Sequence, residues 1–256
     1  MTMSVGFLCS DGVVIGADSQ VTNPSSGYTF HEEKLNVLSV NGVVRHIWSY
    51  AGNSDTAKKL ARELYAKLRS PSTLDKKEVE PLLRAALKKS LRAREHFYTL
   101  FGAYVPNGDP ILWISSGLDV LEVARCEIIG TADSPLSRYF RGLVIDIPAI
   151  NIHQGSVVAA YMIAQAKKYE GAYCGGPTDI YYLHSSGHMG KLSNINSWEQ
   201  RLNQLEDKIV HLLTLLSYPK ENELGVQPGD VGSTDLKKFN AFVLEFCKAI
   251  REKGGF

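Results

Sequence analysis

Apolar runs of strand length recur four times in the first fifty positions, at 4–10, 13–18, 34–40 and 43–50. The dipeptides Asp11-Gly12 and Asn41-Gly42 separate the two members of each pair. Such dipeptides favour the tight turns of β-hairpins. The polar stretch 20–33 between the pairs is typical of a loop. The pattern therefore predicts two antiparallel hairpins joined by a loop.

Helical spacing of apolar residues replaces this pattern in 55–68 and from 76 to about 96. Further strands are predicted at 98–105, 111–115, 120–123, 125–129 and 180–183. Two more helices are predicted at 134–143 and 155–169. Groups of strands that alternate with pairs of helices indicate a layered α+β fold rather than an alternating parallel one.

The last sixty or so positions differ from the rest of the chain in pattern. Apolar residues follow helical spacing in 198–216 and again in 233–251, with a Gly- and Pro-containing loop between them. We therefore expect a main domain over 1–196 and a helical C-terminal extension over 197–256. The apolar faces of the extension predict that it packs on the main domain or on a neighbouring subunit.

Composition narrows the classes of partner. The 256 residues include 28 Lys and Arg against 27 Asp and Glu, so no basic excess suggests a nucleic-acid partner. No apolar run reaches the roughly 20 residues of a membrane span, and no basic leader precedes an apolar run. The four cysteines are scattered without a paired CxxC motif, which is typical of reduced thiols. We therefore expect a cytoplasmic protein with no membrane partner.

Four residues in the two hairpins and at the start of the first helix suggest nucleophilic chemistry: Thr2, Asp18, Lys34 and Gly52. A threonine hydroxyl needs a base, and a free α-amino group with a pKa near 7.7–8.0 supplies one within the same residue. A lysine ammonium favours the alkoxide, and an aspartate holds that lysine charged. A glycine N–H at the start of a helix is a natural donor to an oxyanion.

The stretches that carry these residues resemble the β-type subunits of the 20S proteasome and their divergent bacterial, HslV-like relatives. All are N-terminal nucleophile hydrolases. The resemblance covers 2–184 and is most specific in 2–19, at Lys34 and in 50–68. It implies a four-layer αββα sandwich. The turn 172–176 also resembles the family, with Cys174 in place of a serine.

The resemblance implies a role for each residue. Thr2 is the nucleophile and, through its amine, the base; Asp18 and Lys34 activate it; and Gly52 donates to the oxyanion. Thr131 supplies a hydroxyl beside the nucleophile's amine. The implied activity is that of a threonine endopeptidase acting on peptides or unfolded proteins within a homo-oligomeric ring or spiral. A separate ATP-dependent unfoldase is a further partner that the resemblance allows, and no metal or organic cofactor is implied.

Three alternatives stay open at this point. The chain could keep the fold as a non-catalytic scaffold subunit of a ring. An N-terminal nucleophile amidase could act on small molecules instead of peptides. Cys174 could be a nucleophile with His184 as its base, although 184–188 is also typical of a hairpin turn.

Overall fold

The computed structural model describes residues 2–22, 27–40, 43–68, 76–93, 95–104, 109–130, 150–192 and 195. All of them belong to one compact unit, Met1–Asn196. The predicted helix over 134–143, Thr131 and the predicted C-terminal extension over 197–256 lie outside the described residues. The elements, in chain order, are β1 (Met3–Cys9), β2 (Gly12–Asp18), β3 (Gln20–Thr22), β4 (Thr29–His31), β5 (Leu35–Val40), β6 (Val43–Ala51), α1 (Ser54–Leu68), α2 (Lys76–Ser90), β7 (Tyr98–Ala103), β8 (Ile111–Ser116), β9 (Asp119–Glu122), β10 (Cys126–Gly130), α4 (Ile152–Tyr169), β11 (Thr178–His184) and β12 (Met189–Lys191).

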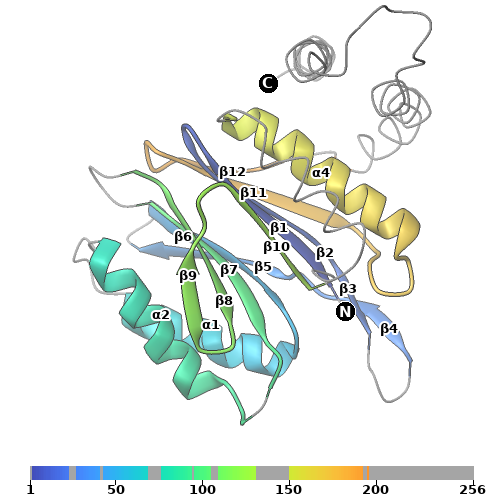
Figure 1. Cartoon of the computed structure of the whole chain (residues 1–256), viewed down its shortest axis with the longest axis horizontal. Coiled ribbons are helices and arrows are strands. Elements are labelled where there is room, and N and C mark those ends of the chain that lie inside the picture. The colour runs from blue at the N-terminus through green and yellow to red at the C-terminus, as the bar shows by residue number, and fades with distance from the viewer. Residues whose placement is uncertain are drawn as a thin grey trace, which may run out of the picture. The chain divides into compact units, whose positions relative to one another are not determined.

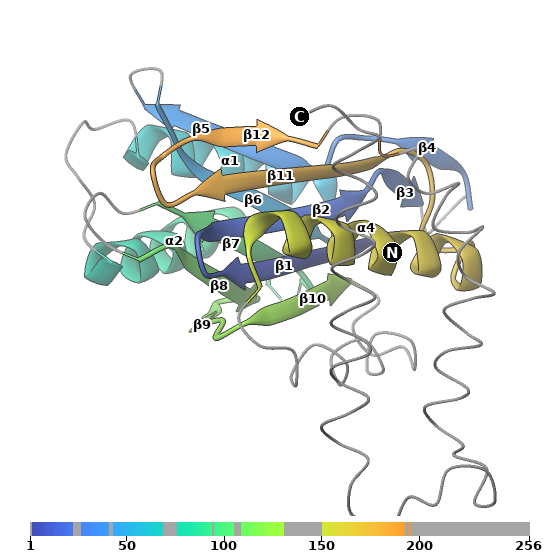
Figure 2. The same cartoon turned by 90° about the horizontal axis from the view of Figure 1, so that it is seen from above.

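Two antiparallel sheets of five strands form the centre of the unit (Figures 1 and 2). One has the strand order β10-β1-β2-β11-β12, and the other has the order β5-β6-β7-β8-β9. The predicted hairpins β1–β2 and β5–β6 are therefore confirmed, as is the hairpin turn after His184, which joins β11 to β12.

The first hairpin turn falls one residue earlier than its sequence suggests. Cys9 pairs with Gly12, so the two-residue loop is Ser10-Asp11 and Gly12 is already in β2. A Cβ at Gly12 would lie 2.3 Å from the carbonyl oxygen of Leu183 in β11. The glycine is thus required by the close approach of the neighbouring strand and not by the turn.

The β5–β9 sheet is buried on both faces, because neighbouring residues in a strand point to opposite sides. Ile47, Leu100 and Leu112 contact one apolar core, while their neighbours Trp48, Phe101 and Trp113 contact another. The first core also contains Val13, Ile15, Ala17, Ile129 and Leu183 from the other sheet, so the two sheets pack face to face. The second contains buried residues of α1 and α2, which cover the outer face (Figure 2).

The other sheet is covered by α4, which contacts β1, β2 and β11. Small residues allow this helix to approach closely: a Cβ at Gly16 of β2 would lie 2.9 Å from the Ile163 side chain. Asn151 and Gln154 form a capping box at the start of α4. The predicted α+β class is therefore confirmed. None of the helices among the described residues is both long enough and apolar enough to span a bilayer.

Two predictions about secondary structure are wrong in detail. The stretch 20–33, predicted to be a loop, contains β3 and β4, which pair as a small separate sheet. Helix α2 ends at Ser90 and not near His96. The carboxylate of Glu95 accepts hydrogen bonds from the Arg92 N–H at 3.0 Å and the Thr56 hydroxyl at 2.7 Å. These contacts hold the chain in a turn that leads into β7.

Candidate active site

A buried carboxylate at the end of β2 accepts four hydrogen bonds, three of them from parts of the chain that are distant in sequence. Asp18 Oδ1 accepts from the backbone N–H of Met3 and from Lys34 Nζ, each at 2.9 Å. Asp18 Oδ2 accepts from the backbone N–H groups of Gln20 and Gly175, each at 3.1 Å. The side chain has no exposed surface. Its negative charge is thus satisfied entirely by protein groups.

Lys34, just before β5, is the only charged donor in this set. Its side chain is fully buried, and its ammonium also donates to the backbone carbonyl of Gln20. Burial lowers the pKa of Lys34, while the charge and hydrogen bond of Asp18 oppose that shift. The lysine proton is therefore easier to remove than that of an exposed lysine.

Thr2 lies directly before β1 and is 6% exposed. The backbone N–H of the next residue, Met3, and Lys34 Nζ both donate hydrogen bonds to the same oxygen, Asp18 Oδ1. Two donors that each lie 2.9 Å from one oxygen can be no farther apart than twice that distance. The fold therefore brings the Lys34 ammonium to the start of β1, beside Thr2.

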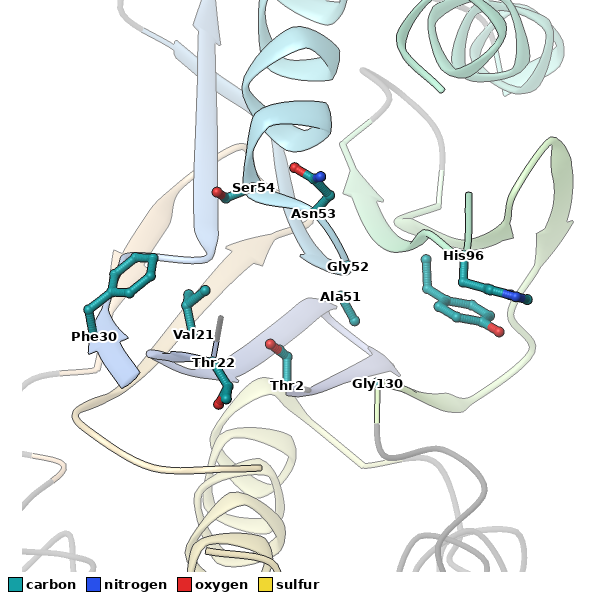
Figure 3. A pocket seen from close by; sticks show the side chains of 11 residues that line it. Thr2, Val21, Thr22, Phe30, Ala51, Gly52, Asn53, Ser54, His96 and Gly130 are labelled. Carbon is teal, nitrogen blue, oxygen red and sulfur yellow. The ribbon is translucent and has the colours of Figure 1, made fainter. Parts of the chain in front are cut away.

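The side chain of Thr2 points into a pocket of about 590 Å³ (Figure 3). The lining residues come from both large sheets, from the β3–β4 sheet and from the start of α1. They are Thr2, Val21, Thr22, Phe30, Ala51, Gly52, Asn53, Ser54, His96, Tyr98 and Gly130. Thr2 and Gly52, two of the predicted site residues, therefore line the same pocket.

Gly52 lies between β6 and α1 with a φ of +138°, a backbone conformation that residues other than glycine rarely adopt. A Cβ there would also lie 2.8 Å from the ring of Phe97. The next residue, Asn53, accepts a hydrogen bond from the Asp55 N–H at 2.8 Å and lines the pocket. The positive end of the α1 dipole therefore lies at the pocket wall, where it favours developing negative charge.

Thr131 lies outside the described residues, but its neighbour Gly130 lines the pocket. Gly130 has a φ of +95°, and a Cβ there would lie 1.7 Å from the carbonyl oxygen of Thr2. Only glycine permits this approach, so Gly130 sets the position of Thr2 through the backbone. The sequence alone predicts no role for Gly130. Its position directly before Thr131 is the sequence feature that could have identified it as a site residue.

The alternative pair of Cys174 and His184 is excluded by the fold. Thr178, at one end of β11, pairs with Asp18, whereas His184, at the other end, pairs with Gly12. Cys174 therefore lies near Asp18 and far from His184. The thiol is 1% exposed, and burial together with the charge of Asp18 raises its pKa to about 12. A thiol of this kind is not a nucleophile at neutral pH.

The fold is similar to solved structures of Anbu, and these likenesses cover most of both chains. Anbu, described as an ancestral beta-subunit, from Yersinia bercovieri has a TM-score of 0.68 at 13% identity over 83% of this chain and 97% of that one. A Gly-1 mutant of Anbu from Hyphomicrobium sp. strain MC1 has a TM-score of 0.68 at 14% identity, covering 84% and 97%. The helical assembly of the Anbu complex from Pseudomonas aeruginosa has a TM-score of 0.62 at 14% identity, covering 82% and 95%.

The sequence matches no protein-family model and is not significantly similar to any curated protein. At the identities of the solved structures, the likeness shows the fold alone. The resemblance to divergent bacterial relatives of the proteasome β-subunit is thereby confirmed at the level of the fold.

Proposed function

We propose that this chain is a threonine-type N-terminal nucleophile peptidase that hydrolyses peptide bonds. The observation that carries the proposal is the hydrogen bonding of Asp18 Oδ1, which joins Lys34 to the backbone N–H that follows Thr2, a residue that lines a pocket. A buried ion pair costs free energy of desolvation and is weak support for stability alone. Its position next to a pocket-facing hydroxyl favours a catalytic role.

The reaction needs a free α-amino group on Thr2, so the preceding residue must first be removed. The neutral amine then accepts the proton of the Thr2 hydroxyl as Oγ attacks the substrate carbonyl. The Lys34 ammonium stabilises the oxygen as it loses this proton and disfavours a second positive charge on the amine. Asp18 keeps Lys34 charged and in place.

In the tetrahedral intermediate, the former carbonyl oxygen carries the negative charge and accepts a hydrogen bond from the backbone N–H of Gly52, just before α1. The C–N bond then breaks, and the leaving amine takes the proton held by the α-amino group. An ester to Thr2 Oγ remains. Water attacks this ester with the amine again as base, which releases the carboxylic acid and restores the hydroxyl.

The remaining features follow from the same proposal. The stacked sheets with their outer helices would be the αββα sandwich of N-terminal nucleophile hydrolases, with 197–256 as a helical extension. The solved helical assembly of the Pseudomonas aeruginosa Anbu complex supports a homo-oligomeric ring or spiral here. Thr131 would hydrogen-bond the amine of Thr2. We place the protein in the cytoplasm, with peptides or unfolded proteins as substrates and a separate ATP-dependent unfoldase as a candidate partner.

Covalent labelling tests this function directly. The purified full chain is incubated with a β-lactone, which acylates an activated hydroxyl, and the adduct is located by intact mass and peptide mapping. N-terminal sequencing establishes whether Thr2 is the first residue. We expect one adduct on Thr2, none in Thr2→Ala and an unchanged adduct in Cys174→Ala. If the chain begins at Thr2 and forms no adduct, the scaffold alternative is favoured.

A further inference from the structure

Among the residues that the structure describes, no carboxylate, ammonium or guanidinium group lines the pocket beside Thr2. Its eleven lining residues include no Asp, Glu, Lys or Arg. The polar groups it does contain are hydroxyls, one amide and one imidazole, which come from Thr2, from Thr22 in β3, from the start of α1 and from the start of β7. A ligand with a full charge would therefore find no oppositely charged partner on these walls.

The small β3–β4 sheet contributes two adjacent apolar side chains to one wall of the pocket, beside the hydroxyl of Thr22. Val21 and Phe30 are direct cross-strand neighbours in this sheet, and both line the pocket (Figure 3). Phe30 is 39% exposed, so much of its ring is available for contact. Ala51 adds a further apolar contact from the end of β6. The apolar wall therefore offers a surface that a large hydrocarbon side chain would cover.

Charged residues that adjoin the β3–β4 sheet in the chain or support Thr2 take part in ion pairs. Asp18 and Lys34 form a buried ion pair at 2.9 Å. Glu32, two residues beyond Phe30, pairs with Lys58 at 3.0 Å. Against the lining residues that the structure describes, an ionised substrate side chain would thus lose hydration without gaining the counter-charge of an Asp, Glu, Lys or Arg. An uncharged side chain avoids this loss and gains from apolar burial.

We infer that the substrate residue on the acyl side of the scissile bond carries a large uncharged side chain, aromatic or branched aliphatic, which packs against Val21, Phe30 and Ala51. The inference rests on the proposed function, because that residue is identified by the attack of Thr2 on its carbonyl. Both acidic and basic residues at this position are disfavoured. The preference separates this chain from a peptidase that cuts after charged residues.

Peptide electrophiles that differ in a single residue test the preference. The reagents are N-acetylated tripeptide epoxyketones with Phe, Leu, Glu or Lys next to the electrophile, and the rate of adduct formation on the full chain is followed by intact mass. We expect Phe and Leu to react at least about tenfold faster than Glu and Lys, in keeping with the discrimination that single side-chain contacts achieve. Equal rates, or faster reaction of Glu or Lys, would overturn the inference.

Charged substitutions in the apolar wall should change the preference in a direction set by their sign. In Phe30→Arg, a cation enters the wall, so the Glu reagent should gain at least about tenfold relative to the Phe reagent. Phe30→Glu should favour the Lys reagent by the same reasoning. Leu121→Arg is the matched control, because Leu121 is 66% exposed on β9 and does not line the pocket. No change of preference in either Phe30 variant would contradict the assigned wall.

A binding measurement separates this inference from the proposed function. Thr2→Ala retains the pocket without the nucleophile, and titration calorimetry reports how the corresponding unreactive tripeptide amides bind to it. If the wild type forms no adduct with any reagent while Thr2→Ala binds the Phe peptide more tightly than the Glu and Lys peptides, the peptidase proposal fails and the pocket preference stands. If adducts form on Thr2 without preference, only the preference fails. No binding and no adduct would overturn both.

Discussion

Replacing Asp18 by Asn tests whether the buried carboxylate organises the site. The carboxylate accepts two donors at each of its oxygens. An asparagine amide has only one acceptor oxygen, so its NH₂ group must face two of these four donors. The substitution also leaves the Lys34 ammonium buried without a counter-charge. The side chain keeps its size, so the effect reports on charge and hydrogen bonding and not on packing.

The size of the effect follows from these losses. Removing one partner of a buried ion pair typically costs about 3–5 kcal/mol, against a total folding free energy of about 5–15 kcal/mol. At a urea m value of about 2–3 kcal/mol/M, this shifts the unfolding midpoint down by about 1–2.5 M. The loss of the opposing Asp18 charge lowers the pKa of Lys34 further. A buried lysine with a lowered pKa makes the folded protein less stable as pH falls, because the unfolded chain binds the proton more readily. The loss of stability in Asp18→Asn relative to the wild type should therefore be larger at pH 6 than at pH 9.

Urea unfolding followed by circular dichroism, at equal protein concentrations, measures this loss. Glu80→Gln is the matched control, because Glu80 pairs with Arg84 at 2.9 Å where both side chains are about half exposed. Such a surface pair contributes about 0.5 kcal/mol or less. The double variant Asp18→Asn/Lys34→Met removes the unpaired charge, so it should be more stable than Asp18→Asn alone.

Activity is measured on the same variants. Asp18→Asn should form the β-lactone adduct at least about tenfold more slowly than the wild type, because Lys34 is no longer held charged beside Thr2. The reasoning is refuted if Asp18→Asn unfolds at the urea concentration of Glu80→Gln and reacts at the wild-type rate. It is also refuted if adding Lys34→Met to Asp18→Asn lowers stability further.

Four further predictions concern the nucleophile, its support, the buried thiols and assembly. Thr2→Ala should abolish peptide hydrolysis with an unchanged circular dichroism spectrum, whereas Thr2→Ser should retain part of the activity. Gly130→Ala should lower activity and reduce the free energy of unfolding by about 1–3 kcal/mol, since its Cβ would lie 1.7 Å from the Thr2 carbonyl oxygen; unchanged values would contradict this role. The raised pKa values of Cys9 and Cys174, both about 12 against 9.0, predict stability that is complete below pH 9 and declines toward pH 12, which unfolding at stepped pH measures. Light scattering should give a mass several times that of one chain, and a monomer at micromolar concentration would count against the assembly.

The local elements of this protein could be predicted from sequence because the signals for them are local. Alternating apolar runs on either side of Asp11-Gly12 determine the β1–β2 hairpin, apart from the one-residue position of its turn. Apolar residues at spacings of three and four determine α1, whose buried face includes Leu60, Leu64 and Leu68. The proposed extension over 197–256 rests on the same kind of signal and stays a prediction. In each case the residues that determine the element lie within that element or its own hairpin.

The contacts that hold the candidate site together are decided by the tertiary structure. Asp18 and Lys34 could be named from their spacing, but the N–H of Gly175 reaches Asp18 only because β11 pairs with β2. The apolar wall of the pocket could not be predicted either. Val21 and Phe30 lie in a stretch whose polar composition indicated a loop, and their pairing depends on the register of two three-residue strands. Hydrogen bonds and pocket walls between distant segments are set by how sheets stack and pair, and no local pattern encodes that geometry.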